Sequence, residues 1–144
     1  MAIKRSGRIG DVIVVVGAVG SPADTEWDAH VAEVTEIYQR RGSVRILVSS
    51  DGGGPTAAQR ARLGKAVAAK NVRSAVLTTS VVIRGVVTAF SWFQPGFRAF
   101  APSDFARAAT HLELSPIEAE QALALLDQLR AESGLPPLSR KDVA

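Results

Sequence analysis

Runs of apolar residues alternate with segments of helical periodicity along the chain, and this pattern predicts an α/β fold. Two segments, Ile3 to Ile9 and Val12 to Val19, flank Gly10-Asp11 and predict the strands of an N-terminal hairpin. The second run opens with VIVVV and does not alternate with polar residues, which is typical of a strand covered on both faces. Further strands are predicted at Val44 to Val48, Ser74 to Thr78 and Phe97 to Ala101.

Apolar residues that recur every three to four positions predict five helices between and after these strands. In the first helix, Ser21 is expected to cap the N-terminus, Pro22 to occupy the first helical position and Gly42 to end the helix. The segment Val81 to Phe93 is rich in β-branched residues, but its polar positions follow a helical period, so we predict a helix there. The other helices are predicted to begin near Thr56, Pro102 and Ser115 and to end near Lys70, Leu112 and Gly134.

The order of these elements, β-β-α-β-α-β-α-β-α-α, predicts one α/β sandwich. We expect a mostly parallel sheet of four to five strands, with an N-terminal hairpin and flanking helices. A length of 144 residues suits one domain with a sizeable core. The predicted domain covers residues 1–134, and residues 135–144 are expected to form a flexible C-terminal tail.

Composition narrows the functional classes. The chain is 47% hydrophobic and 22% charged, as expected of a folded globular domain. It contains no cysteine, which excludes disulfides, thiolate metal sites and cysteine nucleophiles, and which fits a cytoplasmic protein. No apolar run approaches the roughly 18 residues of a membrane span, so no span is predicted.

The net charge of +3 conceals a basic middle. Between Arg40 and Arg107, eleven Lys and Arg residues stand against only Asp51 and Asp104. Two interpretations stay open: the excess meets an acidic partner or a phosphate, or it forms a solubilising surface whose charges pair across neighbouring helices. Nucleic acid is not expected as a partner, because the basic region lacks a known reading motif.

The junction VSSDGGGPT, residues 48–56, joins the central strand to the next helix. A turn in this position presents backbone N–H groups of the helix N-terminus to solvent, where α/β proteins bind anions or partners. Three interpretations stay open: the glycines permit a tight turn, they admit a phosphate to the backbone with help from Arg60, or the loop is the centre of a protein interface. DGGGPT matches neither GxxxxGK[ST] nor GxGxxG, which argues against nucleotide hydrolysis.

The sequence offers no recognisable catalytic or metal constellation. His30 and His111 lie in separate predicted helices, and no nucleophile-elbow sequence accompanies them. Two isolated histidines with scattered carboxylates do not have metal-site spacing. We therefore assign no catalytic residue, no metal ligand and no cofactor.

Aromatic residues are concentrated in one short segment. Phe90, Trp92, Phe93, Phe97 and Phe100 fall within eleven residues. They either pack in the core between a helix and the last strand, or the excess apolar surface of the segment lines a pocket or a homodimer contact.

Two motifs, VSSDGGG at residues 48–54 and FRAFAPSDFARAATHL at residues 97–112, occur within an element order that resembles one known family. The resemblance, over roughly Ile9 to Leu112, is to the SpoIIAA-like bacterial domains with the STAS or SEC14-like fold. The first motif stands where the anti-sigma-factor antagonists carry an Asp-Ser-Ser-Gly-like turn, and the second resembles the closing strand and helix of the family. The resemblance implies a mainly parallel sheet surrounded by helices, no cofactor, and a role in binding or regulating partners.

In the antagonists, a serine at the helix start after this turn is phosphorylated to switch binding. Here Ser49 and Ser50 precede Asp51, whereas the family turn has Asp before Ser, and the helix itself starts at Pro55-Thr56. The resemblance therefore carries over the loop and not the phosphorylation site. Ser50 and Thr56 remain candidates for modification.

Together these observations predict a cytoplasmic, non-enzymatic regulatory domain that binds a protein partner, acidic in character, through the Gly-rich loop and the following helix. The alternative is a small anionic or apolar ligand bound at the same loop or under the Val81 to Phe93 helix. The residues assigned to the partner or anion site are Ser49, Ser50, Asp51, Gly52, Gly53, Gly54, Thr56, Arg60 and Arg62. The residues assigned to an apolar contact, such as that of a homodimer, are Val86, Phe90, Trp92 and Phe93.

Overall fold

The computed structural model describes residues 2–18, 20–50, 52–68 and 70–138. Its elements follow the predicted order, with a short 3-10 helix, η1, before the fourth α-helix. The strands are β1 (Ala2–Ile9), β2 (Val12–Ala18), β3 (Val44–Ser50), β4 (Val72–Thr78) and β5 (Phe97–Phe100). The helices are α1 (Asp24–Arg41), α2 (Ala57–Val67), α3 (Val81–Ser91), η1 (Pro102–Asp104), α4 (Phe105–His111) and α5 (Pro116–Glu132).

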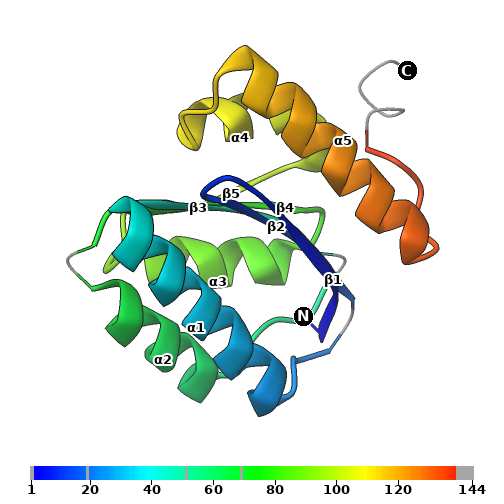
Figure 1. The fold of residues 1–144 in the computed structure, drawn as a ribbon. Helices are drawn as coiled ribbons and strands as arrows, with labels where there is room; N and C mark the ends of the chain where they lie inside the picture. The colour runs from blue at the N-terminus through cyan, green and yellow to red at the C-terminus, as the bar shows by residue number, and fades with distance from the viewer. Residues whose placement is uncertain (1, 19, 51, 69, 139–144) are drawn as a thin grey trace.

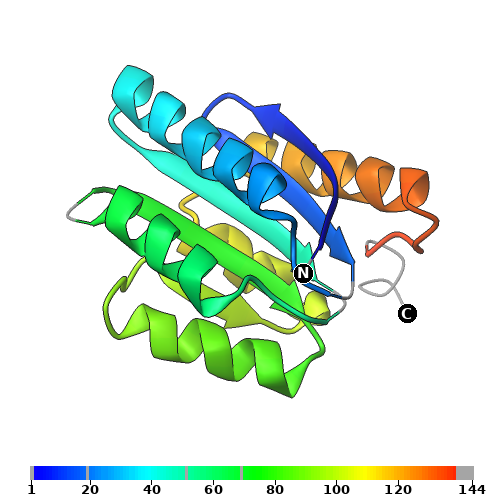
Figure 2. The same ribbon diagram turned by 90° about the horizontal axis from the view of Figure 1, so that it is seen from below.

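The five strands form one mixed sheet, seen nearly edge-on in Figure 1. Their order is β1-β2-β3-β4-β5. β1 pairs antiparallel with β2, and β2 through β5 run parallel. The predicted hairpin and the mostly parallel sheet are therefore confirmed. Because each strand joins the edge made by the strand before it, the connecting helices α1, α2 and α3 lie side by side on one face of the sheet (Figure 2). Helices α4 and α5 cover the other face (Figure 1).

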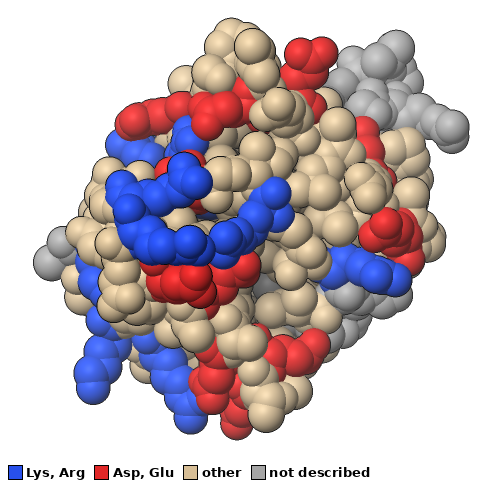
Figure 3. Space-filling model, viewed as in Figure 1, with Lys and Arg blue, Asp and Glu red and all other residues tan. Residues whose placement is uncertain are grey.

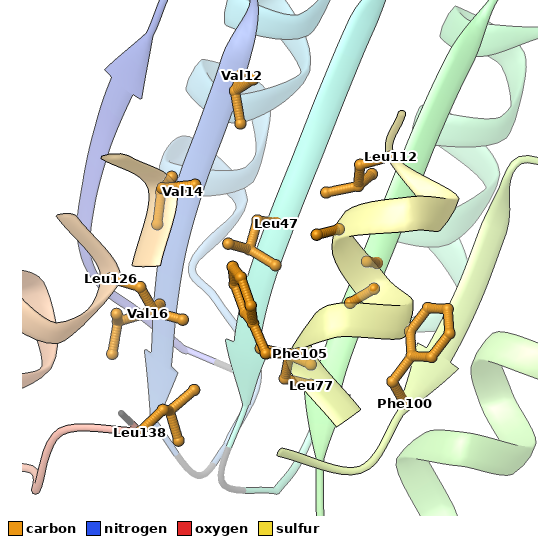
Figure 4. Close-up of a cluster of buried hydrophobic side chains, with 14 of the residues drawn as sticks. Val12, Val14, Val16, Leu47, Leu77, Phe100, Phe105, Leu112, Leu126 and Leu138 are labelled. Atoms are coloured by element: carbon orange, nitrogen blue, oxygen red, sulfur yellow. The ribbon is translucent and has the colours of Figure 1, made fainter. Parts of the chain in front are cut away.

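The side chains of β2 alternate between two hydrophobic cores, which explains the unbroken apolar sequence VIVVV. The core beneath α4 and α5 includes Val12, Val14, Val16, Leu47, Leu77, Phe105 and Leu126 (Figure 4). The core beneath α1 and α2 includes Ile13, Val15, Val34, Ile37, Ile46, Leu63 and Val67.

Side-chain caps determine where α2 and α5 begin. Thr56 Oγ1 accepts a hydrogen bond from the backbone N–H of Gln59, and Gln59 Oε1 accepts one from the backbone N–H of Thr56. Ser115 and Glu118 cap α5 in the same reciprocal way. The start predicted for each helix is confirmed to within a residue or two.

The predicted cap of α1 is wrong. The helix begins beyond Pro22, and the backbone N–H of Ala23 donates to the Glu26 carboxylate. The Ser21 hydroxyl donates to the carbonyl of Gly54 at 2.8 Å. The residue expected to cap α1 therefore connects the segment between β2 and α1 to the Gly-rich loop.

Arg45 joins three segments at the end of the sheet opposite the Gly-rich loop. Its guanidinium contacts Asp11, in the hairpin turn, at 2.6 Å and Glu118, in the first turn of α5, at 2.7 Å. It also donates to the carbonyl of Glu113 at 3.1 Å. One side chain, 16% exposed, therefore holds the hairpin, the central strand and the last helix together.

Several basic residues of the middle of the chain form ion pairs, as the surface interpretation of this region expects. Figure 3 shows basic and acidic side chains next to one another on one face of the molecule. The pairs are Arg40–Glu36, Arg45–Asp11, Arg62–Asp28, Arg73–Glu113 and Arg107–Asp104.

The chain stays packed beyond α5. Leu138 is 2% exposed and belongs to the core beneath that helix, and its backbone N–H donates to Asp127 Oδ1 at 2.7 Å. The segment from Leu135 to Leu138 therefore does not behave as the expected flexible tail, because an apolar side chain at its end fills a place in the core. Residues 139–144 lie outside the described part of the chain.

Candidate functional site

The Gly-rich loop follows the carboxyl end of β3 and packs against the segment that follows β2. A Cβ atom on Gly53 would lie 2.5 Å from the backbone nitrogen of Gly20, and Gly53 has a φ of +65°. Position 53 therefore has to be glycine, because the backbone of Gly20 leaves no room for a side chain there. This explains the glycine at position 53 through a tight turn and close packing, the first of the three interpretations of the loop.

The residues before the loop point to opposite faces of the sheet. Ser49 is 3% exposed, and its hydroxyl accepts a hydrogen bond from the Arg130 guanidinium of α5 at 2.7 Å. Its predicted place on a partner surface is wrong, because the strand period turns it into the core side beneath α5. Ser50, 4% exposed, faces α1, α2 and α3. Asp51 lies outside the described residues.

The remaining loop residues are accessible to different extents. Gly53 and Thr56 are exposed, and Gly52 and Gly54 are partly buried. The Thr56 hydroxyl is engaged as the cap of α2. Of the two candidates for phosphorylation, Thr56 is the accessible one and Ser50 is not.

Arg60 and Arg62 do not form one basic patch. Arg60 is partly buried, donates to the carbonyl of Pro55 at 2.8 Å and faces α3. Arg62 is exposed on the other side of α2, where it forms an ion pair with Asp28 of α1 at 2.7 Å. The two residues were predicted to act together, but helical spacing of two places them on different sides of α2.

Helix α3 is confirmed, and most of its apolar surface is uncovered. Ile83 is the one buried residue of this helix, all of which the structure describes. Val81, Val82, Trp92 and Phe93, at its two ends, are 74% to 81% exposed. Neighbouring apolar side chains that stay exposed are typical of a site of interaction with another molecule.

The uncovered apolar residues of α3 form a regular stripe. Val82, Val86 and Ala89 of α3 are spaced four and three residues apart, the repeat by which one helix packs along another, and Phe93 follows four residues later in the turn after α3. With Gly85, Phe90 and Arg60 they line a surface groove between α2 and α3, called the α3 groove below. Two sets of predicted residues, Arg60 from the loop side and Val86, Phe90 and Phe93 from the aromatic segment, therefore meet in one place. Trp92 lies outside this groove.

The aromatic cluster divides between core and surface. Phe97 is buried and packs edge-on against Phe90, with 4.9 Å between ring centroids. Phe100 is buried on the opposite side of β5, near His111. Core packing thus accounts for part of the cluster, and the exposed Trp92 and Phe93 are left for another role.

A cavity of about 100 Å³ lies under α3, between this helix and the sheet, and is called the inner pocket below. Strand residues Ile46, Val48 and Val76 form its floor, and Val87 and Phe90 lie on the α3 side. The Gly-rich loop borders it as well. Both places named for the alternative ligand, the loop and the space under α3, therefore belong to one cavity.

The two histidines lie on helices at opposite faces of the sheet and do not share a site. His30 of α1 borders the inner pocket, where burial lowers its pKa to about 4. His111 of α4 lies beside Gly96, with 2.8 Å between Nε2 and the carbonyl oxygen, and burial lowers its pKa too. Within the described ranges no three His, Asp or Glu side chains gather in a way that would hold a metal ion.

Sequence reasoning missed three features of this region. It did not place His30, Ser74 or Val82 in a site. The Val82 stripe could have been found from its spacing of four and three. Ser74 gave a weaker signal, as a lone hydroxyl in an apolar strand.

No family model, curated protein or solved structure matches the chain. Among the helices of the described residues, none is both long enough and apolar enough to cross a membrane.

Proposed function

We propose that this protein is a regulatory binding domain, without catalytic activity of its own, that holds an amphipathic helix of a protein partner in the α3 groove. The observation that carries the proposal is the exposed apolar stripe of α3, which no other described element covers. The stripe has the spacing of a helix–helix seam, and a helix laid into an apolar groove is a recurrent mode of recognition.

The charge around the groove indicates the chemistry of the partner. Neither α2 nor α3 contains an acidic residue. Arg60 lies in the groove, Lys65 is exposed on α2 and Arg84 is exposed on α3. Arg62 contributes less, because Asp28 already neutralises it. A partner helix with acidic residues beside its apolar stripe complements this surface.

The proposal includes the SpoIIAA-like, STAS-type assignment of the fold and a cytoplasmic regulatory role. What supports the fold assignment is a hairpin followed by three β-α units that add strands at one edge. The Gly-rich loop then serves as the border of the binding surface and not as its centre. A Cβ on Gly54 would lie 3.2 Å from Ile83 Cδ1, so the loop touches the start of α3.

The test uses a fluorescent peptide of four heptads with Leu at the two seam positions and Glu beside them, and a second peptide with Lys in place of Glu. Anisotropy should show saturable binding of the acidic peptide and at least about tenfold weaker binding of the basic one. Phe93→Asp should weaken the acidic peptide at least about tenfold, because it places a charge in the apolar seam. Ile117→Asp is the matched control, since Ile117 is a large apolar residue of α5 that is 67% exposed.

Absence of binding, or equal binding by the wild type and Phe93→Asp, would contradict the proposal. Analytical ultracentrifugation of the same proteins distinguishes another occupant. A dimer of the wild type that Phe93→Asp dissociates would place a second copy of the chain on the stripe instead of a foreign helix.

A further inference from the structure

The inner pocket exists because two helices leave part of the sheet uncovered. α2 packs chiefly against α1, and α3 packs chiefly against β5. β4 runs between them, and Val76, in the middle of this interior strand, stays partly exposed. Side chains of α2 and α3 close the space above it without filling it.

The size and lining of the pocket fit a small apolar molecule. Its volume is about 100 Å³, and a dry apolar cavity of roughly 150 Å³ is known to take up benzene. Ile46, Val48, Val76 and Phe90 provide an apolar floor and roof. A water cluster would find few partners along these surfaces, because water needs two to four polar groups.

Three polar side chains reach this apolar space and carry no charge at neutral pH. Ser74 lies opposite Ile46 in the parallel register, and Ser50 lies four residues further along β3, roughly 13 Å away. His30 borders the pocket from α1 and is neutral because burial lowers its pKa to about 4. Arg60 is the charged residue of the lining, and its guanidinium is engaged with the carbonyl of Pro55 near the loop.

The Ser74 hydroxyl is the polar group best placed for a ligand. Its side chain is 2% exposed and borders the pocket, and its hydroxyl forms no hydrogen bond to another described residue. No fully buried side-chain N or O atom of the described residues lacks a partner, so the Ser74 hydroxyl keeps some accessible surface. A hydroxyl left without a partner beside an apolar cavity is unfavourable, and a ligand that bonds to it removes this cost.

We propose that the inner pocket binds a neutral, ring-sized apolar molecule that carries one hydroxyl or N–H group, of the phenol or indole class, with this group bonded to Ser74. An anion meets hydroxyls and a neutral imidazole between the helices and the sheet, and the charged lining residue, Arg60, has its guanidinium bonded to the Pro55 carbonyl at the loop. A purely apolar ring leaves the Ser74 hydroxyl without a partner. The pocket and the α3 groove share Arg60, Val86 and Phe90 in their walls, whereas Ser74, Ile46 and Val76 line the pocket alone. A ligand bonded to Ser74 is therefore distinguishable from a helix seated in the groove.

The test compares phenol, toluene and benzoate as probes of the full chain. The reporter is the NMR signal of the Trp27 indole N–H, since Trp27 borders the pocket and this group donates to the carbonyl of Gln59 at 2.7 Å. Phenol should shift the signal saturably, toluene should bind about five- to tenfold more weakly, and benzoate should not bind within the same concentration range.

Ser74→Ala keeps the cavity and removes the hydroxyl. It should weaken the binding of phenol about five- to tenfold and leave the binding of toluene unchanged. A purely structural role of Ser74 would not produce this difference between the two probes. Phe93→Asp, in the α3 groove, should leave phenol binding within about twofold.

Any of three results would overturn the assignment: no saturable shift with phenol, equal binding of phenol and benzoate, or phenol binding that Ser74→Ala does not weaken. Loss of phenol binding in Phe93→Asp would also overturn it, because phenol would then occupy the groove. Failure of this site leaves the peptide experiment on the α3 groove unaffected.

Discussion

His30 is a titratable side chain held in its neutral form by the fold. It packs against Trp27, with 5.3 Å between ring centroids, and borders the inner pocket. Burial lowers its pKa from 6.5 to about 4, since the charged imidazolium would lose its hydration. The same burial that keeps His30 neutral therefore makes the stability of the protein depend on pH.

We predict that the free energy of unfolding falls as the pH is lowered from about 6.5 to about 4. In this window the unfolded chain binds a proton at His30 and the folded protein does not, so protonation favours the unfolded state. The loss from this one group is up to about 3 kcal/mol. The stability gained by neutral His30 is present in full above pH 6.5.

Urea denaturation of the wild type and His30→Gln between pH 7 and pH 4.5 measures this effect. The variant should lose less stability over the range, and His111→Gln serves as a control for the second histidine. The pKa of Glu118, lowered to about 2 by Arg45, adds its own loss only when the pH falls below about 4.5. If the free energy of unfolding fell equally with pH in the wild type and in His30→Gln, His30 would bind its proton as easily in the folded state as in the unfolded state.

At the scale of elements, the Gly-rich loop is held by the segment that precedes α1. Gly53 lies against the backbone of Gly20, and Gly54 accepts the hydrogen bond from Ser21. The segments that lead into α1 and α2 therefore pack together at the carboxyl ends of the parallel strands, next to the inner pocket.

Gly53→Ala should destabilise the protein by about 2–4 kcal/mol, because it adds a left-handed residue and a clash with the Gly20 backbone. Gly134→Ala is the matched control: its φ is +77°, and nothing lies within 4 Å of the added Cβ. The control should lose only the stability that a non-glycine residue in the left-handed conformation costs, about 1 kcal/mol. Equal losses in thermal or chemical unfolding would show that the loop moves away from Gly20 without cost.

The elements themselves were largely predictable, because each depends on local periodicity. The unbroken VIVVV indicated a doubly covered strand, and the polar period of residues 81–93 indicated a helix in spite of its β-branched residues. The outward direction of the α3 stripe could not be predicted. A stripe of apolar residues has the same spacing whether it faces the sheet or solvent, and only the placement of α2 and β5 decides between them.

The residues predicted for the partner site do not all lie on one surface, because the geometry of strands and helices separates neighbours in sequence. Strand alternation separates Ser49 from Ser50, and helix geometry separates Arg60 from Arg62. The separation of the two serines could have been predicted, because successive side chains of a strand point to opposite faces of the sheet. The contact of Ser49 with Arg130, 81 residues away in sequence, follows from the tertiary fold and has no local signal.

At the scale of the whole molecule, Arg45 connects segments that are far apart in sequence. Asp11 lies 34 residues before it and Glu118 lies 73 residues after it. Because Arg45 and Asp11 are 16% and 13% exposed, water screens their interaction less than it screens a surface pair.

We predict that Arg45→Met lowers the free energy of unfolding by about 3 kcal/mol, since it leaves two carboxylates facing each other without a cation. Arg40→Met, which breaks an exposed pair with Glu36, should cost less than about 0.5 kcal/mol. Chemical denaturation at pH 7 compares the two. A loss of similar size in both variants would show that solvent reaches Arg45 as freely as it reaches Arg40.

The order in which the strands join the sheet has a consequence for synthesis on the ribosome. β2 emerges early, and each later β-α unit adds to the edge already made, so one face of the sheet is covered as the chain grows. The other face, with Val12, Val14 and Val16, receives its cover only when α4 and α5 emerge at the end. The most apolar strand of the nascent chain therefore waits through most of translation for its final packing, and this face is the one that a chaperone would hold.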